Sequence, residues 1–266
     1  MSILANKTKA VRDMPVDGIY VIYGITGSGK TVLASTFPKT ADEPMLYLDI
    51  LEGDTGSISE DELENIVVAE INEFNDLVEV FDDVERGFSV DEETGDKVPV
   101  KYSTIVLSTA TQLEYLLKEH LMKSNNKDMM NLNLWGQARS GHDQIWNMAK
   151  YLHKKTGANI VILAHQKEVQ DEEQSSFNKL IPSLMNAAAY GLCAKASFVW
   201  YTKVESEPKI DQKTQEVKHE LKYYTYIDSH PYLLTKTRRP KEMTIPQKIN
   251  NLTFSKFKKN ILDKLK

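Results

Sequence analysis

The chain has 266 residues, of which 41% are hydrophobic and 27% charged, and its formal net charge is −5 at pH 7. This length can bury one full core, and the composition is ordinary for a soluble globular protein. No apolar run approaches the length of a membrane span, and Cys193 is the only cysteine, which excludes an internal disulfide. We therefore expect a cytoplasmic protein that does not contact a membrane.

After an N-terminal arm (residues 1–17), the sequence predicts a glycine-rich turn between a strand and a helix. An apolar strand is expected at residues 18–23, and a short helix at residues 31–37 that ends at Pro38. Residues 24–31 read Gly-Ile-Thr-Gly-Ser-Gly-Lys-Thr and match the phosphate-binding pattern G-x-x-x-x-G-K-[ST]. Glycines let backbone N–H groups curl around a phosphate, and a helix N-terminus favours negative charge.

This pattern predicts a nucleotide site with ATP and Mg²⁺ as cofactors. The Lys30 ammonium is expected to reach the β- and γ-phosphates, and the Thr31 hydroxyl to contact Mg²⁺. The expected nucleotide contacts are Gly24, Ile25, Thr26, Gly27, Ser28, Gly29, Lys30, Thr31 and Thr36.

Further along the chain, apolar runs alternate with helical periodicity. Strands are expected at residues 44–50, 65–71, 102–108, 159–164 and 197–201. Helices are expected at residues 74–84, 113–121, 135–156, 183–194 and 253–266. Residues 91–96 read as a solvated turn, residues 166–179 as a polar loop, and residues 219–234 as one or two antiparallel strands.

Strands that are apolar on both sides and alternate with helices predict an α/β fold, with a mostly parallel twisted sheet flanked by helices and some antiparallel strands. Ligands of such sheets bind beyond the carboxyl ends of the strands. Besides the glycine-rich turn, the residues at these ends are Asp49 to Glu52, Ser108, His165 and Gln166.

Charge is distributed unevenly along the chain. Residues 52–98 carry 17 acidic residues against Arg86 and Lys97, which gives −15, whereas residues 231–266 carry 10 basic residues against Glu242 and Asp263, which gives +8. Two solvated faces of opposite sign explain this pattern. A basic tail that meets nucleic-acid phosphates, or the acidic face of a neighbouring subunit, explains it equally well.

The order of these motifs resembles the RecA-like ATPase core, and most closely the short phage-type RecA-like ATPases of the Sak type, which act in single-strand annealing or recombination. The resemblance rests on residues 24–31, 47–53, 104–109, 164–166 and 236–238 and covers roughly residues 18 to 240. It implies a RecA-like ATPase core at residues 18–240, followed by a basic C-terminal helical tail at residues 241–266.

In the RecA-like family, an acidic residue after the second core strand orients the water that attacks the γ-phosphate. Glu52 occupies this place, but the segment from Asp49 to Glu52 is one residue longer than the usual D-x-E, so Asp49 is a rival. The family also has an aspartate where the third core strand ends here in Ser108. A serine hydroxyl can hydrogen-bond a metal-bound water but supplies no negative charge. The predicted metal residues are Thr31, Asp49 and Ser108. Either Mg²⁺ is held by Thr31, the phosphates and Asp49, or hydrolysis is slow.

The resemblance assigns two further roles. A polar residue at the end of the next core strand senses the γ-phosphate, and Gln166 matches it, with His165 in the preceding place. Lys236 and Arg238 resemble the K-x-R finger that a neighbouring subunit inserts into the ATP site. Both also fit the simple start of a basic tail. The expected catalytic residues are therefore Lys30, Glu52, Gln166, Lys236 and Arg238.

The resemblance implies an ATPase that acts on single-stranded DNA in phage recombination or annealing, in the host cytoplasm. A homo-oligomer, ring or filament, and a single-strand-binding protein are the other expected partners. Aromatic residues interleaved with lysines at 222–226 and 254–259 could stack on bases, although a strand face and a helix face explain them better. The alternatives are a P-loop nucleoside or nucleotide kinase, and a nucleotide-gated scaffold with little hydrolysis.

Overall fold

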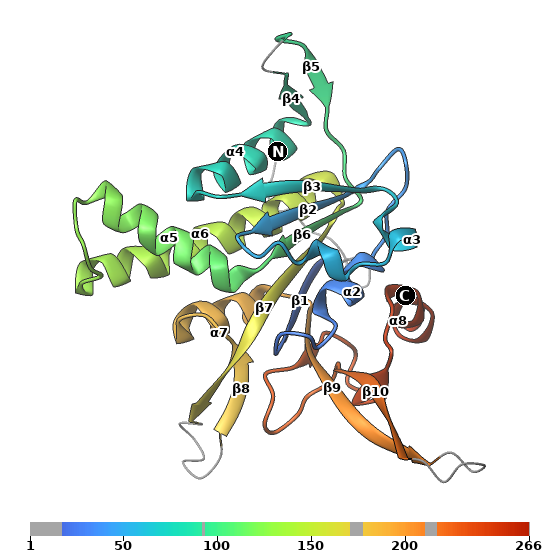
Figure 1. Ribbon diagram of the computed structural model, residues 1–266. Coiled ribbons are helices and arrows are strands. Elements are labelled where there is room, and N and C mark those ends of the chain that lie inside the picture. Colours follow the sequence, from blue (N-terminus) through green and yellow to red (C-terminus); the bar gives the residue numbers. More distant parts are fainter. Residues whose placement is uncertain (1–17, 92–93, 171–177, 211–216, 266) are drawn as a thin grey trace, which may run out of the picture.

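The computed structural model describes residues 18–91, 94–170, 178–210 and 217–265, and the predicted N-terminal arm lies outside these ranges (Figure 1). Its centre is one ten-stranded sheet. The main path is β12 (Lys248–Asn250), β10 (Val217–Tyr226), β9 (Phe198–Ile210), β1 (Ile19–Gly24), β7 (Asn159–Gln170), β6 (Thr104–Ser108), β2 (Met45–Ile50) and β3 (Ile66–Ile71). All neighbours from β9 to β3 are parallel, whereas β10 and β12 extend the sheet in antiparallel fashion.

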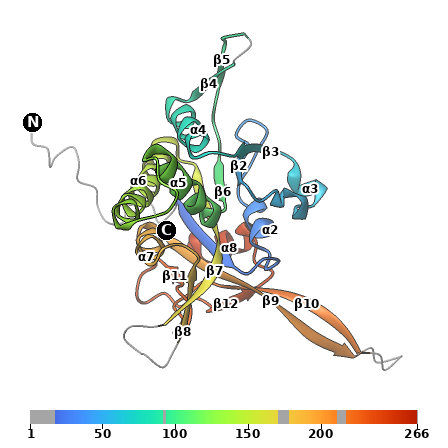
Figure 2. The same cartoon turned by 60° about the vertical axis from the view of Figure 1, so that its left-hand side comes forward.

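Helices cover both faces of this sheet, which gives three layers (Figure 2). One face carries α4 (Phe74–Arg86), α5 (Ala110–Ser124), α6 (Leu132–Thr156) and α7 (Asn186–Lys195), and the other carries α2 (Lys30–Ser35) and α8 (Phe254–Asn260). The smaller elements are η2 (Asp54–Ser57), α3 (Glu60–Leu63), β4 (Phe88–Val90), β5 (Lys97–Pro99), β8 (Asn178–Pro182), β11 (Lys236–Thr237) and η3 (Leu262–Lys264). The predicted α/β fold with a mostly parallel sheet is confirmed.

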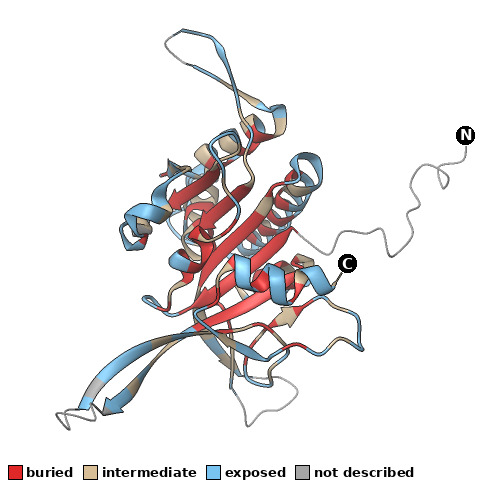
Figure 3. Cartoon of the chain, turned by 90° about the vertical axis from the view of Figure 1, so that its right-hand side faces the viewer, coloured by how far each residue is buried: buried red, intermediate tan, exposed pale blue. Residues whose placement is uncertain are grey.

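The strand β1 shows why the chain forms this central layer. All six of its residues are buried. Because successive side chains of a strand point to opposite faces, Val21 and Tyr23 join the core under α4 to α7, while Tyr20 and Ile22 join the core under α2 and α8. A strand buried on both faces requires an unbroken apolar run, which is the pattern that the sequence shows. Figure 3 shows the resulting buried band through the centre of the sheet.

Several element boundaries differ from the sequence-based expectation. Residues 166–170 continue β7 and residues 178–179 begin β8, where a polar loop was expected, and the expected strand at 197–201 runs on to Ile210 as β9. These extensions pair in antiparallel ladders, β7 with β8 and β9 with β10. Their side chains are largely polar because no helix layer covers them, so hydrophobic patterning does not reveal them. Residues 171–177 and 211–216 lie outside the described ranges.

The C-terminal segment packs onto the core. β12 extends the sheet from β10, and α8, which ends at Asn260 rather than running to the C-terminus, buries Phe254 and Phe257. The ring of Phe257 lies 4.6 Å from that of Trp200, and the ring of Phe254 lies 4.6 Å from that of Phe37. The predicted domain boundary at residue 240 stays a prediction, but residues beyond it help to fill the core under α2. None of the described helices is long and apolar enough to cross a bilayer.

We expect Phe257→Ala to lower the free energy of unfolding by about 3–5 kcal/mol, because the ring is fully buried and its removal leaves a cavity. Urea unfolding followed by circular dichroism measures this difference. Lys258→Ala, on the exposed side of the same helix, is the control and should change stability by less than about 0.5 kcal/mol. Equal stability of the Phe257 variant and the wild type would show that α8 does not belong to the folded core.

Candidate active site

The glycine-rich turn forms a curled loop between β1 and α2. Gly27 and Gly29 have φ angles of 76° and 85°, a conformation that residues with a side chain rarely adopt. A Cβ atom on Gly29 would also lie 3.1 Å from the ring of Tyr223. Successive N–H groups in such a left-handed turn at a helix start form an anion-binding concavity. The local geometry therefore fits a phosphate group.

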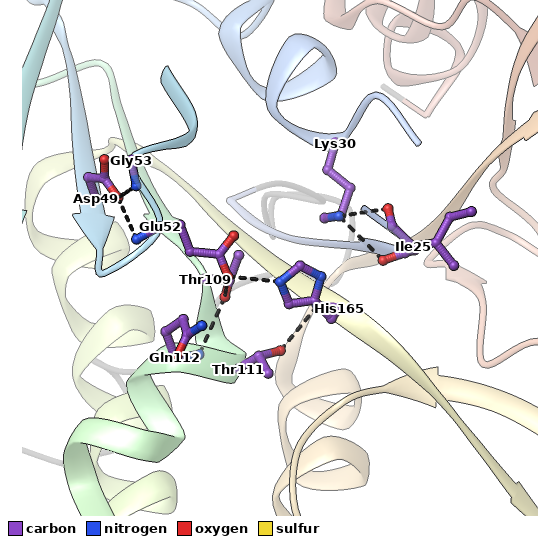
Figure 4. A network of polar contacts seen from close by, with 10 residues as sticks. Ile25, Lys30, Asp49, Glu52, Gly53, Thr109, Thr111, Gln112 and His165 are labelled. Carbon is purple, nitrogen blue, oxygen red and sulfur yellow. Dashed lines mark hydrogen bonds and ion pairs between the residues drawn. The ribbon is translucent and has the colours of Figure 1, made fainter. Parts of the chain in front are cut away.

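Lys30 is the first residue of α2, and its side chain is buried. The ammonium donates hydrogen bonds to the carbonyl oxygens of Ile25 (2.9 Å) and Gly24 (3.3 Å), which lie across the loop (Figure 4). A buried ammonium needs such acceptors because desolvation without them is costly. A phosphate bound in the loop would offer Lys30 charged acceptors at the same place.

The loop opens into a cavity of about 810 Å³, within the range typical of small-molecule sites. Its floor is formed by residues 26–33 and by Thr36. One wall carries Glu52, residues 53, 56 and 57, and Glu62, together with His165. The opposite wall carries Thr202, Tyr223, Thr225 and residues 251–253. The second wall belongs to β9, β10 and the segment between β12 and α8.

Glu52 and His165 point toward one another at this cavity, from the loop after β2 and from β7 (Figure 4). His165 Nε2 lies 2.8 Å from Glu52 Oε1, and the Thr109 hydroxyl donates to the same oxygen at 3.0 Å. Burial raises the pKa of Glu52, but the hydrogen bonds from His165 and Thr109 and the charges of His165 and Lys30 outweigh it, so the pKa lies below its usual value. An ionised carboxylate only accepts hydrogen bonds, so Nε2 of His165 carries the proton.

Asp49 lies at the end of β2 and faces the backbone of the following turn. Its Oδ1 accepts hydrogen bonds from the N–H groups of Glu52 (3.2 Å) and Gly53 (2.9 Å). Of the two residues between these carboxylates, Leu51 has a positive φ of 59°. The extra residue in this segment therefore forms a tight turn that Asp49 closes and that presents Glu52 to the cavity. This use of its carboxylate weakens the prediction that Asp49 holds the metal or activates water.

Ser108 is the second predicted metal residue that stays away from the cavity wall. It is fully buried at the end of β6 and lies opposite Asp49 in the ladder with β2. Only Thr31 of the predicted metal residues lines the cavity. Within the described ranges, no cluster of three His, Cys, Asp or Glu side chains could hold a metal ion. The residues fit a Mg²⁺ that is held mainly by nucleotide phosphates and the Thr31 hydroxyl.

The other predicted catalytic residues lie outside the cavity. Gln166 follows His165 in β7 and pairs with Pro182 of β8, and its side-chain oxygen is buried without a hydrogen-bond partner in the part of the chain that the structure describes. Since neighbouring side chains of a strand point to opposite faces, the strand presents His165 to Glu52 and turns Gln166 away. The prediction that Gln166 senses the γ-phosphate therefore lacks geometric support within this chain.

Lys236 is the first residue of the short strand β11, and Arg238 directly follows this strand. The Lys236 ammonium donates to the carbonyl oxygens of Cys193 (2.7 Å) and Ala194 (3.2 Å) at the end of α7, a favourable place for a cation. Arg238 is exposed, and its N–H bonds Ser197, which in turn bonds the start of β1. Arg238 therefore lies at the amino ends of the parallel strands, roughly 17 Å along β1 from the glycine-rich loop at their carboxyl ends. The finger role stays a prediction that requires a second subunit.

Sequence reasoning did not identify the wall formed by Thr202, Tyr223, Asn251 and Thr253. The only signal was the run of tyrosines at 223, 224 and 226, which the sequence placed on a strand face. Thr36, predicted to contact the nucleotide, lines the cavity. Its hydroxyl also links α2 to the start of α8, because it donates to Leu33 O (2.7 Å) and accepts from Phe254 N (2.9 Å).

A phosphate-binding loop at the carboxyl edge of a parallel sheet, with a cationic and an anionic side chain facing one cavity, defines a P-loop nucleotide-binding protein. The comparison with protein families agrees: the model of the AAA domain family matches residues 18–239. The chain belongs to the AAA domain family, whose members are generally nucleotide-binding ATPases. No curated protein matches the chain.

We expect Glu52→Gln to bind ATP with nearly unchanged affinity but to hydrolyse it at least about 100-fold more slowly, because it keeps the side-chain shape and loses the carboxylate that can polarise water. Asp49→Asn is the matched variant. Its amide oxygen can still accept the two backbone hydrogen bonds, so hydrolysis should fall by less than about fivefold. Release of inorganic phosphate measures both rates. The reverse ranking would identify Asp49 as the catalytic carboxylate.

Proposed function

We propose that this protein binds Mg²⁺·ATP in the cavity and hydrolyses it, with Lys30, Thr31, Glu52 and His165 in the central roles. The observation that carries the proposal is that Lys30 and Glu52 border one cavity, where the lysine charge helps to lower the carboxyl pKa. A cation on the phosphate side and an ionised carboxylate on the water side are what γ-phosphoryl transfer to water requires.

Each of these residues has a task that its contacts support. Lys30 exchanges the carbonyl oxygens of Gly24 and Ile25 for phosphate oxygens, and the N–H groups of the loop bind the remaining phosphate oxygens. Glu52 accepts a hydrogen bond from the attacking water and holds it in line, while His165 and Thr109 fix the carboxylate through its Oε1. Bound Mg²⁺ would neutralise charge on the phosphate oxygens beside Thr31.

A nucleotide-gated scaffold with little hydrolysis is the second candidate, and Ser108 favours it. Ser108 provides no carboxylate at the place where the RecA-like family has an aspartate, and Asp49 beside it already binds backbone N–H groups. Hydrolysis would then depend on Glu52 alone and be slow. A nucleotide kinase has less support, because the chain has only five arginines, and none of the four within the described ranges lines the cavity.

We expect Lys30→Ala to weaken ATP binding about 10- to 100-fold, because one buried charge-assisted contact to phosphate is worth about 1.5–3 kcal/mol. Isothermal titration calorimetry with ATP and Mg²⁺ measures the change. Lys101→Ala, a surface lysine whose ammonium pairs with Glu43 outside the cavity, is the control and should bind like the wild type. If Lys30→Ala binds ATP with unchanged affinity, the nucleotide does not occupy this loop.

We further propose that the protein is a phage-type recombination ATPase that assembles head to tail and binds single-stranded DNA with its basic end. The two ends of the sheet support this. β12 at one end of the sheet, and α8 on the face beside it, carry the exposed lysines 248, 256, 258 and 259. In contrast, β3 and α4 at the other end belong to the acidic segment 52–98. Opposite charges at the two ends of one sheet suit association between copies.

The basic end would bind DNA through charge rather than through stacking. Phe254 and Phe257 of α8 are buried in the core, which agrees with the favoured interpretation of residues 254–259 as a helix face and leaves these rings unable to stack on bases. Tyr224 donates its hydroxyl to Glu207 on the charged side of β10. What remains is a row of lysine side chains, which attracts phosphates without reading sequence.

We expect a variant with glutamine at Lys256, Lys258 and Lys259 to bind an oligo-dT strand more weakly, and the slope of log K against log salt to fall by up to about 2, since each contact to a single strand contributes about 0.7. Fluorescence anisotropy over a salt series measures both. The control replaces Lys123, Lys150 and Lys154, exposed lysines of α5 and α6, and should leave the slope unchanged. Absence of wild-type binding at low salt would contradict the DNA proposal.

A further inference from the structure

The cavity extends beyond the reach of the phosphate-binding loop. Its floor continues from Lys30 and Thr31 past Val32 and Leu33 to Thr36. A triphosphate in the loop accounts for the first part of this floor. The rest, between the acidic wall and the wall formed by β10 and residues 251–253, has room for the nucleoside. The two walls differ in chemistry, and this difference indicates which of them binds the base.

The acidic wall is poorly suited to a base. Glu52 is engaged by His165 and Thr109, and Glu62 accepts a hydrogen bond from the Ser35 hydroxyl (2.8 Å). Carboxylates offer only acceptors, whereas a purine edge presents donors and acceptors side by side. Neither carboxylate offers a flat apolar face.

Of the three tyrosines of β10, Tyr223 lines the opposite wall and differs from the other two in its side-chain contacts. Tyr224 bonds Glu207 through its hydroxyl, and the ring of Tyr226 packs 5.9 Å from that of Tyr201 and 5.5 Å from His230. The side chain of Tyr223 makes neither a hydrogen bond nor a ring contact to another described residue. Tyr223 is 39% exposed and stands beside Gly29 at the edge of the loop. Its ring is therefore available to a ligand.

Next to Tyr223, Asn251 forms hydrogen bonds to other described residues through its backbone groups and not through its side chain. Its N–H donates to Tyr223 O (2.8 Å), and its carbonyl oxygen accepts from the Lys256 ammonium (2.8 Å). Its φ of 45° is a left-handed conformation that asparagine tolerates better than most residues. The side-chain amide makes no hydrogen bond to another described residue, and it offers one donor group and one acceptor.

We propose that Tyr223 and Asn251 form the base-binding half of the nucleotide site, with Tyr223 stacking on adenine and Asn251 bonding its polar edge; this rests on the proposed binding of ATP to the glycine-rich loop. An aromatic face stacks on any base, and an amide can pair with the adjacent donor and acceptor of adenine, as it does in DNA recognition. Thr36, whose hydroxyl accepts from Phe254 N, ties the segment that carries Asn251 to the end of α2.

Tyr223→Ala tests the stacking role, with two ligands compared by isothermal titration calorimetry. The variant should bind ATP about 10- to 100-fold more weakly, as expected for loss of one base-stacking ring, but bind inorganic tripolyphosphate like the wild type. Tyr224→Ala, the neighbouring tyrosine on the other side of β10, should bind both ligands like the wild type, and thermal unfolding checks that both variants fold. Unchanged ATP affinity, or an equal loss for both ligands, would overturn the proposal, because the ring would then be dispensable or would only support the loop.

Asn251→Leu tests the choice of base. The wild type should prefer ATP over GTP, because guanine presents two acceptors, O6 and N7, at the corresponding edge, and one amide group can donate to only one of them while its oxygen faces the other. The variant should lose most of this preference while keeping its affinity for tripolyphosphate. An unchanged preference in the variant would exclude Asn251 from base recognition. A wild type that binds neither ATP nor tripolyphosphate would instead contradict the nucleotide site itself.

Discussion

The site depends on the parallel register of three neighbouring strands. Gly24, the last residue of β1, lies level with His165 of β7 on one side and with Thr202 of β9 on the other. This alignment places the phosphate-binding loop between His165, which contacts Glu52, and β9, which pairs with β10 in a hairpin. A shift of one residue in either pairing would turn His165 or Thr202 to the opposite face.

Within this frame, each carboxylate of the second core strand has a different environment. Asp49 binds two backbone N–H groups and so shapes the turn, while Glu52 reaches the cavity and is held by a histidine and a threonine. The turn residue Leu51, with its positive φ, allows this separation. The longer spacing that makes the assignment ambiguous in the sequence is thus the reason that only one carboxylate reaches the cavity. Ser108, buried at the end of β6 opposite Asp49, adds no negative charge to this pair of carboxylates.

How much the sequence reveals depends on how local the cause is. The glycine-rich loop, the parallel strands of the central sheet and the helices α4 and α6 follow from short-range patterns, and they were predicted. Tyr223 and Asn251 reach the cavity because β9 pairs with β1 from a distant part of the chain, β10 pairs with β9, and β12 pairs with β10, and periodicity carries no information about such pairing. Lys236 lies beside α7 for the same kind of reason. The choice between His165 and Gln166 depends on which way one strand faces, which a single sequence does not fix.

The C-terminal segment links the two proposed activities. The backbone of Asn251 joins it to Tyr223 and, through Lys256, to α8, whose lysines form the basic end of the sheet. Phe254, which directly follows the wall residues 251–253, is buried against Phe37 just beyond the helix that begins with Lys30. A nucleotide bound between the loop and this wall would therefore contact both α2 and the segment that leads into α8, which are packed against each other. If bound nucleotide changes the affinity of α8 for DNA by some factor, bound DNA must change the affinity for the nucleotide by the same factor, because such coupling is reciprocal.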